Sequence, residues 1–351
     1  MTKQKLNLIL ISICLASTFS HIIFSRSIHR MVDPQTPTIT VYDDQNPNLK
    51  YTLSDSHIKR FPLFEAYNES YLNSKKLPHE AILFRNHSKK MVLGKQLSSQ
   101  LENLVAEILA GKTEFTNFKI LKKKDFNFKT KCGLIVLKFK DFPFVAKIFI
   151  ENPKSLARPF SKGLFPMGMF VMGGSNRHLN GFTRIKNMEN IKAKIVNHPV
   201  WADKLSVPRK WFWVPQQPRW LHIEARNLGG HAQESTKFPA IYTIVADEII
   251  AEPTTFARNG IRNLAICRDL DFAIDPHYSN FVIEEKTKKL VMYDTEHFPT
   301  LIGSYFAKLR QARRYVGWYT HLARNFLKQR AFSSKTCQRR RQRPGSVYPL
   351  Y

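Results

Sequence analysis

The sequence is poor in cysteine, and its few cysteines are widely spaced. Only four occur in 351 residues, at Cys14, Cys132, Cys267 and Cys337. Zinc modules and disulfide scaffolds need closely spaced cysteines such as a Cys-x-x-Cys pair, and the chain has none. We therefore expect neither a structural zinc site nor a disulfide framework.

Acidic residues are scarce as well. The chain has 27 Asp and Glu against 55 Lys and Arg, which gives a formal net charge of +28. Such an excess suits anionic partners, including nucleotides, phospholipid surfaces and nucleic acid. A basic bias of the whole lineage would explain the same charge, so it identifies no partner. The 43% hydrophobic content is typical of a globular protein and not of a disordered one.

One stretch lacks charge altogether. Leu6–Phe24 follows two lysines, has no formally charged residue and is just long enough to span a bilayer as a helix. A positive start followed by an apolar run is typical of a membrane signal or anchor. We expect residues 1–30 to form a signal peptide or transmembrane helix, which would make the protein membrane-associated or exported. Cleavage of the segment and the side of the membrane stay open.

The next 80 residues pass from linker to helix. Residues 31–91 begin with a proline-punctuated stretch and are predicted to be a linker and an N-terminal extension. Within Val92–Gly111, leucines and isoleucines recur at helical spacing before a terminating glycine. This pattern predicts a packing helix at the start of the domain.

The pattern then changes to strands. Phe118–Leu121 is a short strand candidate, and Gly133–Glu151 is predicted to be a hairpin that turns at Lys140–Pro143. The second strand of this hairpin carries Lys147 within Val-Ala-Lys-Ile. Taken alone, the strand favours a solvent-facing lysine.

A second helix and more strands follow an insertion at residues 152–181, which suits a cover loop or an anion-binding nest. After Thr183, four apolar residues recur at helical spacing, and Glu189 lies next to this stripe. Aromatic and aliphatic runs then predict strands at three further places, Pro208–Val214, Trp220–Glu224 and Ile241–Ile250.

Polar residues with metal-binding potential gather in Ile274–Phe298. Asp275 and Asn280 lie five residues apart, and Asp294 directly follows a pair of short apolar runs. Such runs predict a two-strand hairpin with carboxylate and amide groups at its mouths. Taken singly, these residues fit turn and cap roles. A metal site that includes His277 and His297 is disfavoured, because no histidine pair has zinc-motif spacing.

In combination, these parts resemble the protein-kinase-like fold. Lys147 resembles the strand lysine that holds nucleotide phosphates, Asp275 the catalytic-loop aspartate, and Asn280 and Asp294 the metal ligands. The resemblance implies a helix carboxylate that pairs with Lys147. Glu189 is the first candidate for it, and Glu224 is the second. The form D-x-H-x-x-N is similar to the small-molecule and aminoglycoside phosphotransferase branch.

The resemblance implies an α+β, bilobal protein that transfers phosphoryl groups. It would have an antiparallel-sheet small lobe with an insertion at residues 92–250, a shortened, mainly helical large lobe at 251–334 and a basic tail at 335–351. ATP and Mg²⁺ would be the cofactors of an atypical, membrane-targeted, ATP-dependent phosphotransferase. It would move the γ-phosphate to an unknown hydroxyl acceptor, a protein or a small molecule.

Three departures keep other functions open. No G-x-G-x-x-G precedes Lys147, Ala273 stands where the family has histidine, and Asp294-Thr295-Glu296 replaces Asp-Phe-Gly. A pseudokinase scaffold is therefore one alternative. A basic binding protein of membranes or nucleic acid is the other, although nucleic acid is the less favoured partner.

Overall fold

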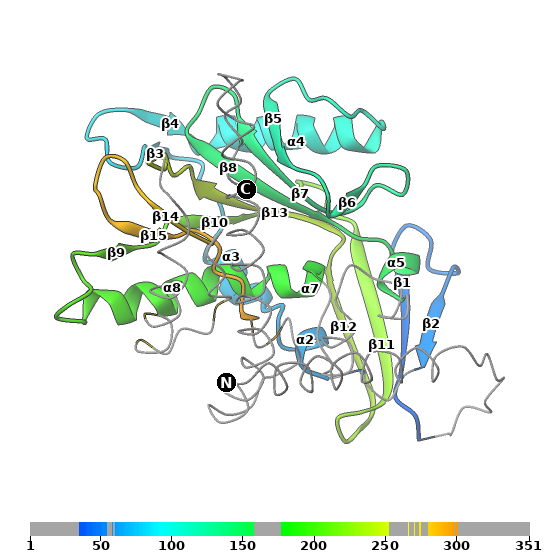
Figure 1. Cartoon of the computed structure of the whole chain (residues 1–351). Coiled ribbons are helices and arrows are strands. Elements are labelled where there is room, and N and C mark those ends of the chain that lie inside the picture. The colour runs from blue at the N-terminus through cyan, green and yellow to red at the C-terminus, as the bar shows by residue number, and fades with distance from the viewer. Residues whose placement is uncertain are drawn as a thin grey trace, which may run out of the picture. The chain divides into compact units, whose positions relative to one another are not determined.

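The computed structural model describes residues 35–54, 58, 60–157, 177–252, 266, 270, 274, 280–298 and 300. The chain divides into two compact units, residues 1–36 and 37–351. Every element discussed below lies in the second unit (Figure 1). The protein is of the α+β class, with mainly antiparallel sheets and few helices, as the sequence predicts at this level.

A six-stranded antiparallel sheet forms the centre of the second unit. Its strands run in the order β10-β13-β8-β7-β5, and the short β6 pairs with β7. Apolar residues occupy nearly every position of the inner strands β8 and β13, because both faces of the sheet are covered. The predicted strand and hairpin are confirmed here, and the strands span Phe118–Lys122 (β5), Phe126–Asn127 (β6), Cys132–Phe139 (β7), Phe144–Ile150 (β8), Lys210–Trp213 (β10) and Ile241–Asp247 (β13).

A four-stranded sheet lies beside the central one, in the order β12-β11-β1-β2. Its β1 (Thr38–Asp43) was predicted to be linker, but it pairs along its whole length with β11 (Trp220–Leu228). Alternate β1 residues are buried against the core, which is the period of a half-buried strand. The remaining strands are β2 (Tyr51–Ser54) and β12 (His231–Pro239).

Two longer helices cover opposite faces of the central sheet. Neighbouring residues of a strand point to opposite faces, and β10 shows which helix lies on each. Trp213 donates from Nε1 to Ser98 of α4 (Gly94–Leu109), whereas Phe212 packs on Phe182 at the start of α8 (Thr183–Val196). Both helices were predicted. Gly111, just beyond α4, has φ +82°, as expected for a helix-terminating glycine.

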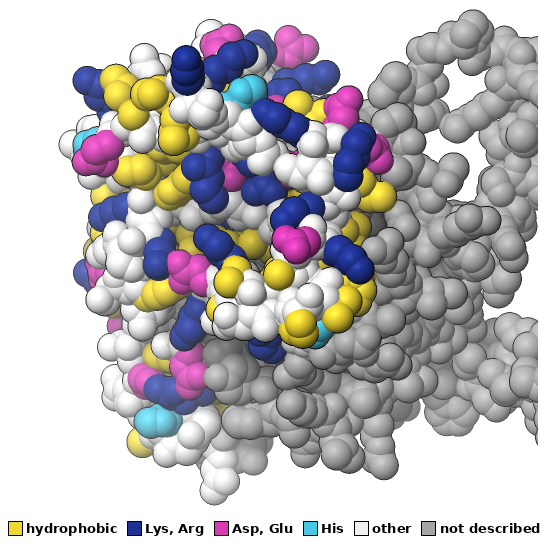
Figure 2. Space-filling model, turned by 90° about the vertical axis from the view of Figure 1, so that its left-hand side faces the viewer, with side chains coloured by type: hydrophobic (Ala, Val, Ile, Leu, Met, Phe, Trp, Pro, Cys, Tyr) yellow, Lys and Arg dark blue, Asp and Glu magenta, His cyan; other side chains and the backbone are white. Residues whose placement is uncertain are grey.

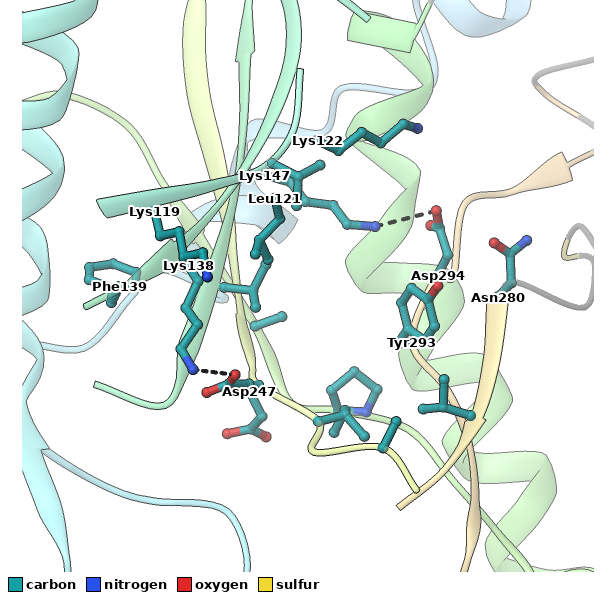
Figure 3. Close-up of a pocket in the computed structure, with 18 of the residues that line it drawn as sticks. Lys119, Leu121, Lys122, Lys138, Phe139, Lys147, Asp247, Asn280, Tyr293 and Asp294 are labelled. Carbon is teal, nitrogen blue, oxygen red and sulfur yellow. Dashed lines mark hydrogen bonds and ion pairs between the residues drawn. The ribbon is translucent and has the colours of Figure 1, made fainter. Parts of the chain in front are cut away.

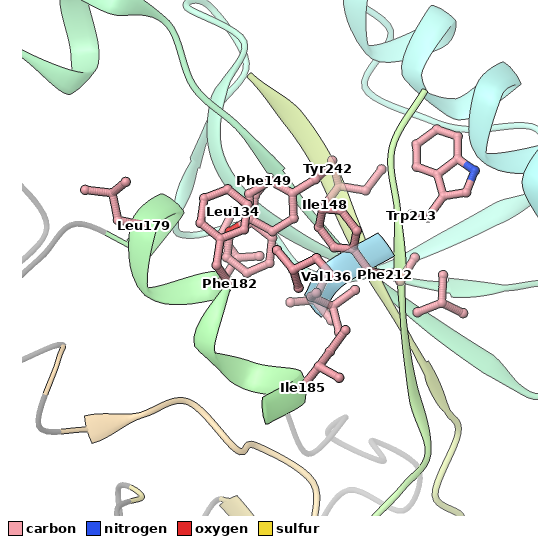
Figure 4. Close-up of a cluster of buried hydrophobic side chains, with 14 of the residues drawn as sticks. Leu134, Val136, Ile148, Phe149, Leu179, Phe182, Ile185, Phe212, Trp213 and Tyr242 are labelled. Carbon is pink, nitrogen blue, oxygen red and sulfur yellow. The ribbon is translucent and has the colours of Figure 1, made fainter. Parts of the chain in front are cut away.

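The face under α8 is filled by aromatic rings (Figure 4). Tyr242 and Phe149, paired across β13 and β8, stack with centroids 4.7 Å apart, and Phe182 stacks on Tyr242 at 4.2 Å. Such pairs stabilise the fold beyond their buried area. The short elements around this layer are α2 (Arg60–Leu63), α3 (Glu69–Asn73), β3 (Ala81–Leu83), β4 (Met91–Leu93), α5 (Pro153–Leu156) and α7 (Arg177–Gly181).

A third sheet carries the polar motif. Strands β14 (Phe281–Ile283) and β15 (Leu290–Met292) form the predicted antiparallel hairpin. On its other edge, β15 pairs in parallel with β9 (Leu205–Ser206), which shortly precedes β10, an edge strand of the central sheet. The hairpin is therefore bonded to the chain segment that enters the central sheet.

The described part of the structure does not bear out the prediction of a transmembrane helix. No helix in the described ranges is long and apolar enough to cross a membrane. The apolar run at residues 6–24, on which that prediction was made, lies outside those ranges, as do most of the predicted large lobe and the whole basic tail.

Candidate functional site

A cavity of about 700 Å³ lies between the central sheet and the β14–β15 hairpin (Figure 3). Its volume falls in the range of pockets that hold cofactors and small molecules. The sheet supplies an apolar wall and the hairpin supplies the opposite one, with contributions from Leu121, Leu134, Val136, Val145, Ala246, Val282 and Tyr293.

The cavity has an excess of positive charge. Among the described residues, seven basic side chains line it against three acidic ones, Asp247, Glu248 and Asp294. All three acids are paired with cations, Asp247 with Arg209 at 2.7 Å and Glu248 with Lys138 at 2.5 Å. The surplus charge suits an anionic ligand, and the basic lining residues are Lys119, Lys122, Lys138, Lys140, Lys147, Arg177 and Arg184.

Lys147 projects into this cavity from β8. Its Nζ lies 3.3 Å from Oδ2 of Asp294, and its side chain is 14% exposed. Alternation along the strand explains its direction, because Val145 also lines the cavity while Ala146 and Ile148 are fully buried on the other face. Burial lowers the pKa of Lys147 to about 8, although Asp294 acts in the opposite direction. The solvent-facing interpretation was therefore wrong.

Asn280 and Asp294 lie at the mouths of the hairpin, as predicted, and both line the cavity. The Tyr293 backbone N–H donates to the Asn280 carbonyl at 3.2 Å, which holds the two mouths together. Burial disfavours the charged form of Asp294, but Arg184, Lys147 and Lys210 outweigh it and hold its pKa well below the usual value. An amide and an ionised carboxylate are the hard oxygen ligands that Mg²⁺ takes beside phosphate and water.

Arg184 is a site residue that sequence reasoning missed. It lies in the first turn of α8 with a side chain only 1% exposed, and it forms ion pairs with Asp294 and Glu296. Burial works against its charge, but the two carboxylates hold its pKa above the ordinary arginine value. Its spacing contained a signal, since Arg184 precedes Met188 by four residues and so continues the buried stripe of Met188 and Ile191.

Lys210 was missed for a similar reason. It begins the aromatic strand β10 and is only 6% exposed. Its Nζ donates to the Tyr293 carbonyl at 3.0 Å and to the Thr295 hydroxyl, on both sides of Asp294. Burial and the nearby charge of Lys147 lower its pKa well below the ordinary lysine value. A lysine next to an apolar run is usually read as a strand end.

The predicted helix carboxylate does not meet Lys147. Glu189 ion-pairs with Lys75 at 2.6 Å and accepts a hydrogen bond from Tyr71 at 2.6 Å. It lies one position off the buried stripe, so the helix turns it outward. The second candidate, Glu224, is on β11 and pairs with Lys50 at 3.4 Å. In the described residues, the partner of Lys147 is Asp294.

Two residues of the predicted motif, Asp275 and His277, lie outside the described residues. Ile274, next to Asp275, is fully buried and bridges to His297. His297 bonds through Nδ1 to the Thr300 hydroxyl at 2.6 Å, and burial lowers its pKa to about 4. The described ranges contain no cluster of three or more His, Cys, Asp or Glu side chains that could hold a metal ion on its own.

A second cavity, of about 900 Å³, lies against the C-terminal half of α8, β9 and β10. Figure 2 shows the side of the molecule to which these elements extend, with Lys and Arg side chains spread among apolar ones. Three of its basic side chains are already paired, Lys75 with Glu189, Arg85 with Glu284 and Arg209 with Asp247. Its lining carboxylate, Glu189, is already bonded to Lys75 and Tyr71. The first cavity brings Lys147, Asn280 and Asp294 together and is therefore the better candidate site.

Comparison with known proteins adds no identity, since no family model, curated protein or solved structure matches the chain significantly.

Proposed function

We propose that the protein is an ATP-dependent phosphotransferase of the kinase-like type, which moves the γ-phosphate to a hydroxyl acceptor. One observation carries the proposal. The lysine of β8, the third long strand in the sheet, forms an ion pair at 3.3 Å with the aspartate after the β14–β15 hairpin, and both line a cavity large enough for a nucleotide. Phosphoryl transfer needs charge neutralisation and alignment at such a place more than it needs covalent chemistry.

Each residue has a role in this proposal. Lys147 holds the phosphate oxygens, while Asn280 and Asp294 hold Mg²⁺, which neutralises the phosphate charge when it is bound. Asp275 orients the acceptor hydroxyl. The apolar walls receive the base, with Val136 on the sheet side and Val282 on the hairpin side. The central sheet would then belong to the small lobe, and the β14–β15 hairpin to the large lobe.

The first experiment measures binding. Calorimetric titration with ATP should show affinity that increases with Mg²⁺ or Mn²⁺, and Asp294→Ala should remove the metal-dependent part. Lys147→Met should weaken binding with and without metal. Glu224→Ala, which changes a carboxylate remote from the cavity, is the matched control. ATP binding that is indifferent to both Asp294 and Lys147 would overturn the proposal.

The second experiment measures transfer. Radiolabelled ATP should label either the protein itself or a mixture of hydroxyl acceptors. Asp275→Asn should abolish labelling but leave ATP affinity within about twofold, because a residue acting only in the transition state changes the rate and not ground-state binding.

A nucleotide-binding scaffold without transfer activity is the second candidate. Both carboxylate oxygens of Asp294 are engaged, Oδ1 by Arg184 and Oδ2 by Lys147. This arrangement opposes metal binding. Tight ATP binding without labelling, unchanged by Asp275→Asn, would favour the scaffold.

A further inference from the structure

Arg184 and Glu296 invert the charges that the kinase-like resemblance implies. There a helix carboxylate pairs with the strand lysine, but here the helix supplies an arginine. The anion that pairs with this arginine is Glu296, two residues after Asp294. Oε1 of Glu296 lies 3.0 Å from Nη2 of Arg184. The chain departs from Asp-Phe-Gly at Thr295-Glu296, and the negative charge of Glu296 is complementary to the positive charge of Arg184 on α8.

The first turns of α8 hold the segment after β15 firmly. Thr295 donates from its hydroxyl to the Arg184 carbonyl at 2.7 Å, and its own carbonyl accepts from the Asn187 side chain at 3.1 Å. The Arg184 guanidinium also lies over the Phe149 ring, 5.7 Å from its centroid. The Arg184 guanidinium is therefore held by Asp294, Glu296 and the Phe149 ring.

Arg184 and Lys147 both contact Asp294 at the wall of the cavity, which all three residues line. Each binds one oxygen of the Asp294 carboxylate, and each lines the cavity. A divalent cation needs at least one of these oxygens, and repulsion from the cation already bound there favours displacement of that side chain. Phosphate oxygens compete for the same two cations, and arginine binds phosphate especially well because its fork of donors fits the anion.

We propose that Arg184 is a second phosphate-binding residue and that, with Lys147, it forms a charge latch on Asp294. A di- or triphosphate draws both cations away, and Asp294 becomes free for the metal ion. Metal and polyphosphate therefore bind cooperatively, and each binds weakly alone. The inference rests on the proposed function, and it assigns a ligand contact and a binding order to residues of that site.

The test is the affinity for Mn²⁺ alone, measured by paramagnetic resonance of the free ion. In the wild type, saturating pyrophosphate should increase Mn²⁺ affinity by about 5- to 150-fold, the range typical of coupled sites. Arg184→Gln should increase the affinity for Mn²⁺ alone and decrease the affinity for metal-free pyrophosphate. Arg177→Gln removes another cavity-lining arginine, which contacts Asp125 instead, and should leave Mn²⁺ binding unchanged.

Glu296→Gln tests the latch in the opposite direction and keeps Arg184 in place. Without the Glu296 carboxylate, Arg184 pairs only with Asp294 and binds it more strongly. The affinity for Mn²⁺ in the absence of pyrophosphate should therefore decrease. Circular dichroism of every variant checks folding. If Arg184→Gln does not fold, Glu296→Gln still decides. Unchanged Mn²⁺ affinity in the folded variants would overturn the latch.

The two proposals fail in different ways. If the wild type binds neither ATP nor pyrophosphate in the presence of Mn²⁺, the proposed function fails, and the latch fails with it. If the wild type binds metal and nucleotide together but Arg184→Gln leaves both single affinities unchanged, only the latch fails.

Discussion

Lys147 Nζ and Asp294 Oδ2 lie 3.3 Å apart, and this contact joins the central sheet to the β14–β15 hairpin across the cavity. The two residues are separated by 147 positions in the chain. Lys147 lies in the middle of β8 and Asp294 lies shortly after β15, and local sequence patterns predict both strands. This contact and the residues around it have consequences for ligand binding and for stability that can be measured.

Anion binding should weaken in alkali. The pKa of Lys147 is lowered to about 8, so its charge is lost as the pH rises above that value. We expect the affinity for metal-free pyrophosphate to fall by up to about tenfold per pH unit above pH 8 until Lys147 is neutral. Lys147→Arg keeps its charge and should give a flat profile between pH 7.5 and 9.5. Equal profiles for the two proteins would contradict the assignment.

The same lysine should affect stability. Its folded-state pKa is below the ordinary value of 10.5, so the unfolded chain binds more protons between about pH 8 and 10.5. The cost of burying the charge is fully present below pH 8 and is relieved as the pH rises. Urea unfolding should show that Lys147→Met removes an upward slope of about 1.4 kcal/mol per pH unit in this window.

His178 should make the fold sensitive to acid. It is 4% exposed within the aromatic layer, and burial lowers its pKa to about 3, although its Nε2 bonds to the Pro239 carbonyl at 3.0 Å. The unfolded chain takes up the proton first, so stability falls as the pH drops from about 6.5 to 3, by about 1.4 kcal/mol per pH unit. Unfolding of His178→Gln should depend less steeply on pH there. Exposed His231 supplies the control, His231→Gln.

Gly133 should not tolerate a side chain. It has φ +116°, and an added Cβ would lie 2.2 Å from the Asp125 carbonyl oxygen. That oxygen accepts the Leu134 N–H at 2.9 Å, so it cannot move freely. Gly133→Ala should cost about 3 kcal/mol in the free energy of unfolding. Gly111, with φ +82° and no neighbour within 4 Å, isolates the backbone strain, and Gly111→Ala should cost only about 1 kcal/mol.

Glu284 should anchor the hairpin. Its carboxylate accepts hydrogen bonds from Arg85 at 2.7 Å, Asn86 at 2.9 Å and Thr287 at 2.6 Å. Glu284→Gln keeps the shape but removes the charge, and it should cost about 1.5–3 kcal/mol, as for a buried charged hydrogen bond. The exposed neighbour provides the comparison, because Glu285→Gln should change stability by less than about 0.5 kcal/mol. A similar loss in both variants would contradict the anchor.

Local patterns predicted most elements of the central sheet and both long helices. Alternation and helical spacing are properties of a few consecutive residues, so β7, β8, α4 and α8 could be read directly. The pairing of β1 with β11 could not, because it joins segments about 180 residues apart and β1 is flanked by proline and acidic turns. Thr38–Asp43 was therefore predicted to be part of a linker.

The site residues that could be predicted are polar residues next to or within apolar runs. Lys147 interrupts an apolar run, Asn280 precedes one and Asp294 follows one, and the structure brings all three to one cavity. Arg184 and Lys210 could not be found in this way, because sequence reasoning assigns isolated cations to the surface. Their burial depends on carboxylates and carbonyls that only the folded chain supplies.

The parallel pairing of β9 with β15 restricts how the cavity can change its width. The backbone that bonds to the hairpin through Leu205 and Ser206 continues directly into β10 and the central sheet. A wide hinge opening between sheet and hairpin would strip this ladder together with the Arg85–Glu284 ion pair. Ligand exchange should therefore proceed by rearrangement of side chains around a nearly constant frame, and ligand-free and ligand-bound proteins should scatter X-rays almost identically in solution.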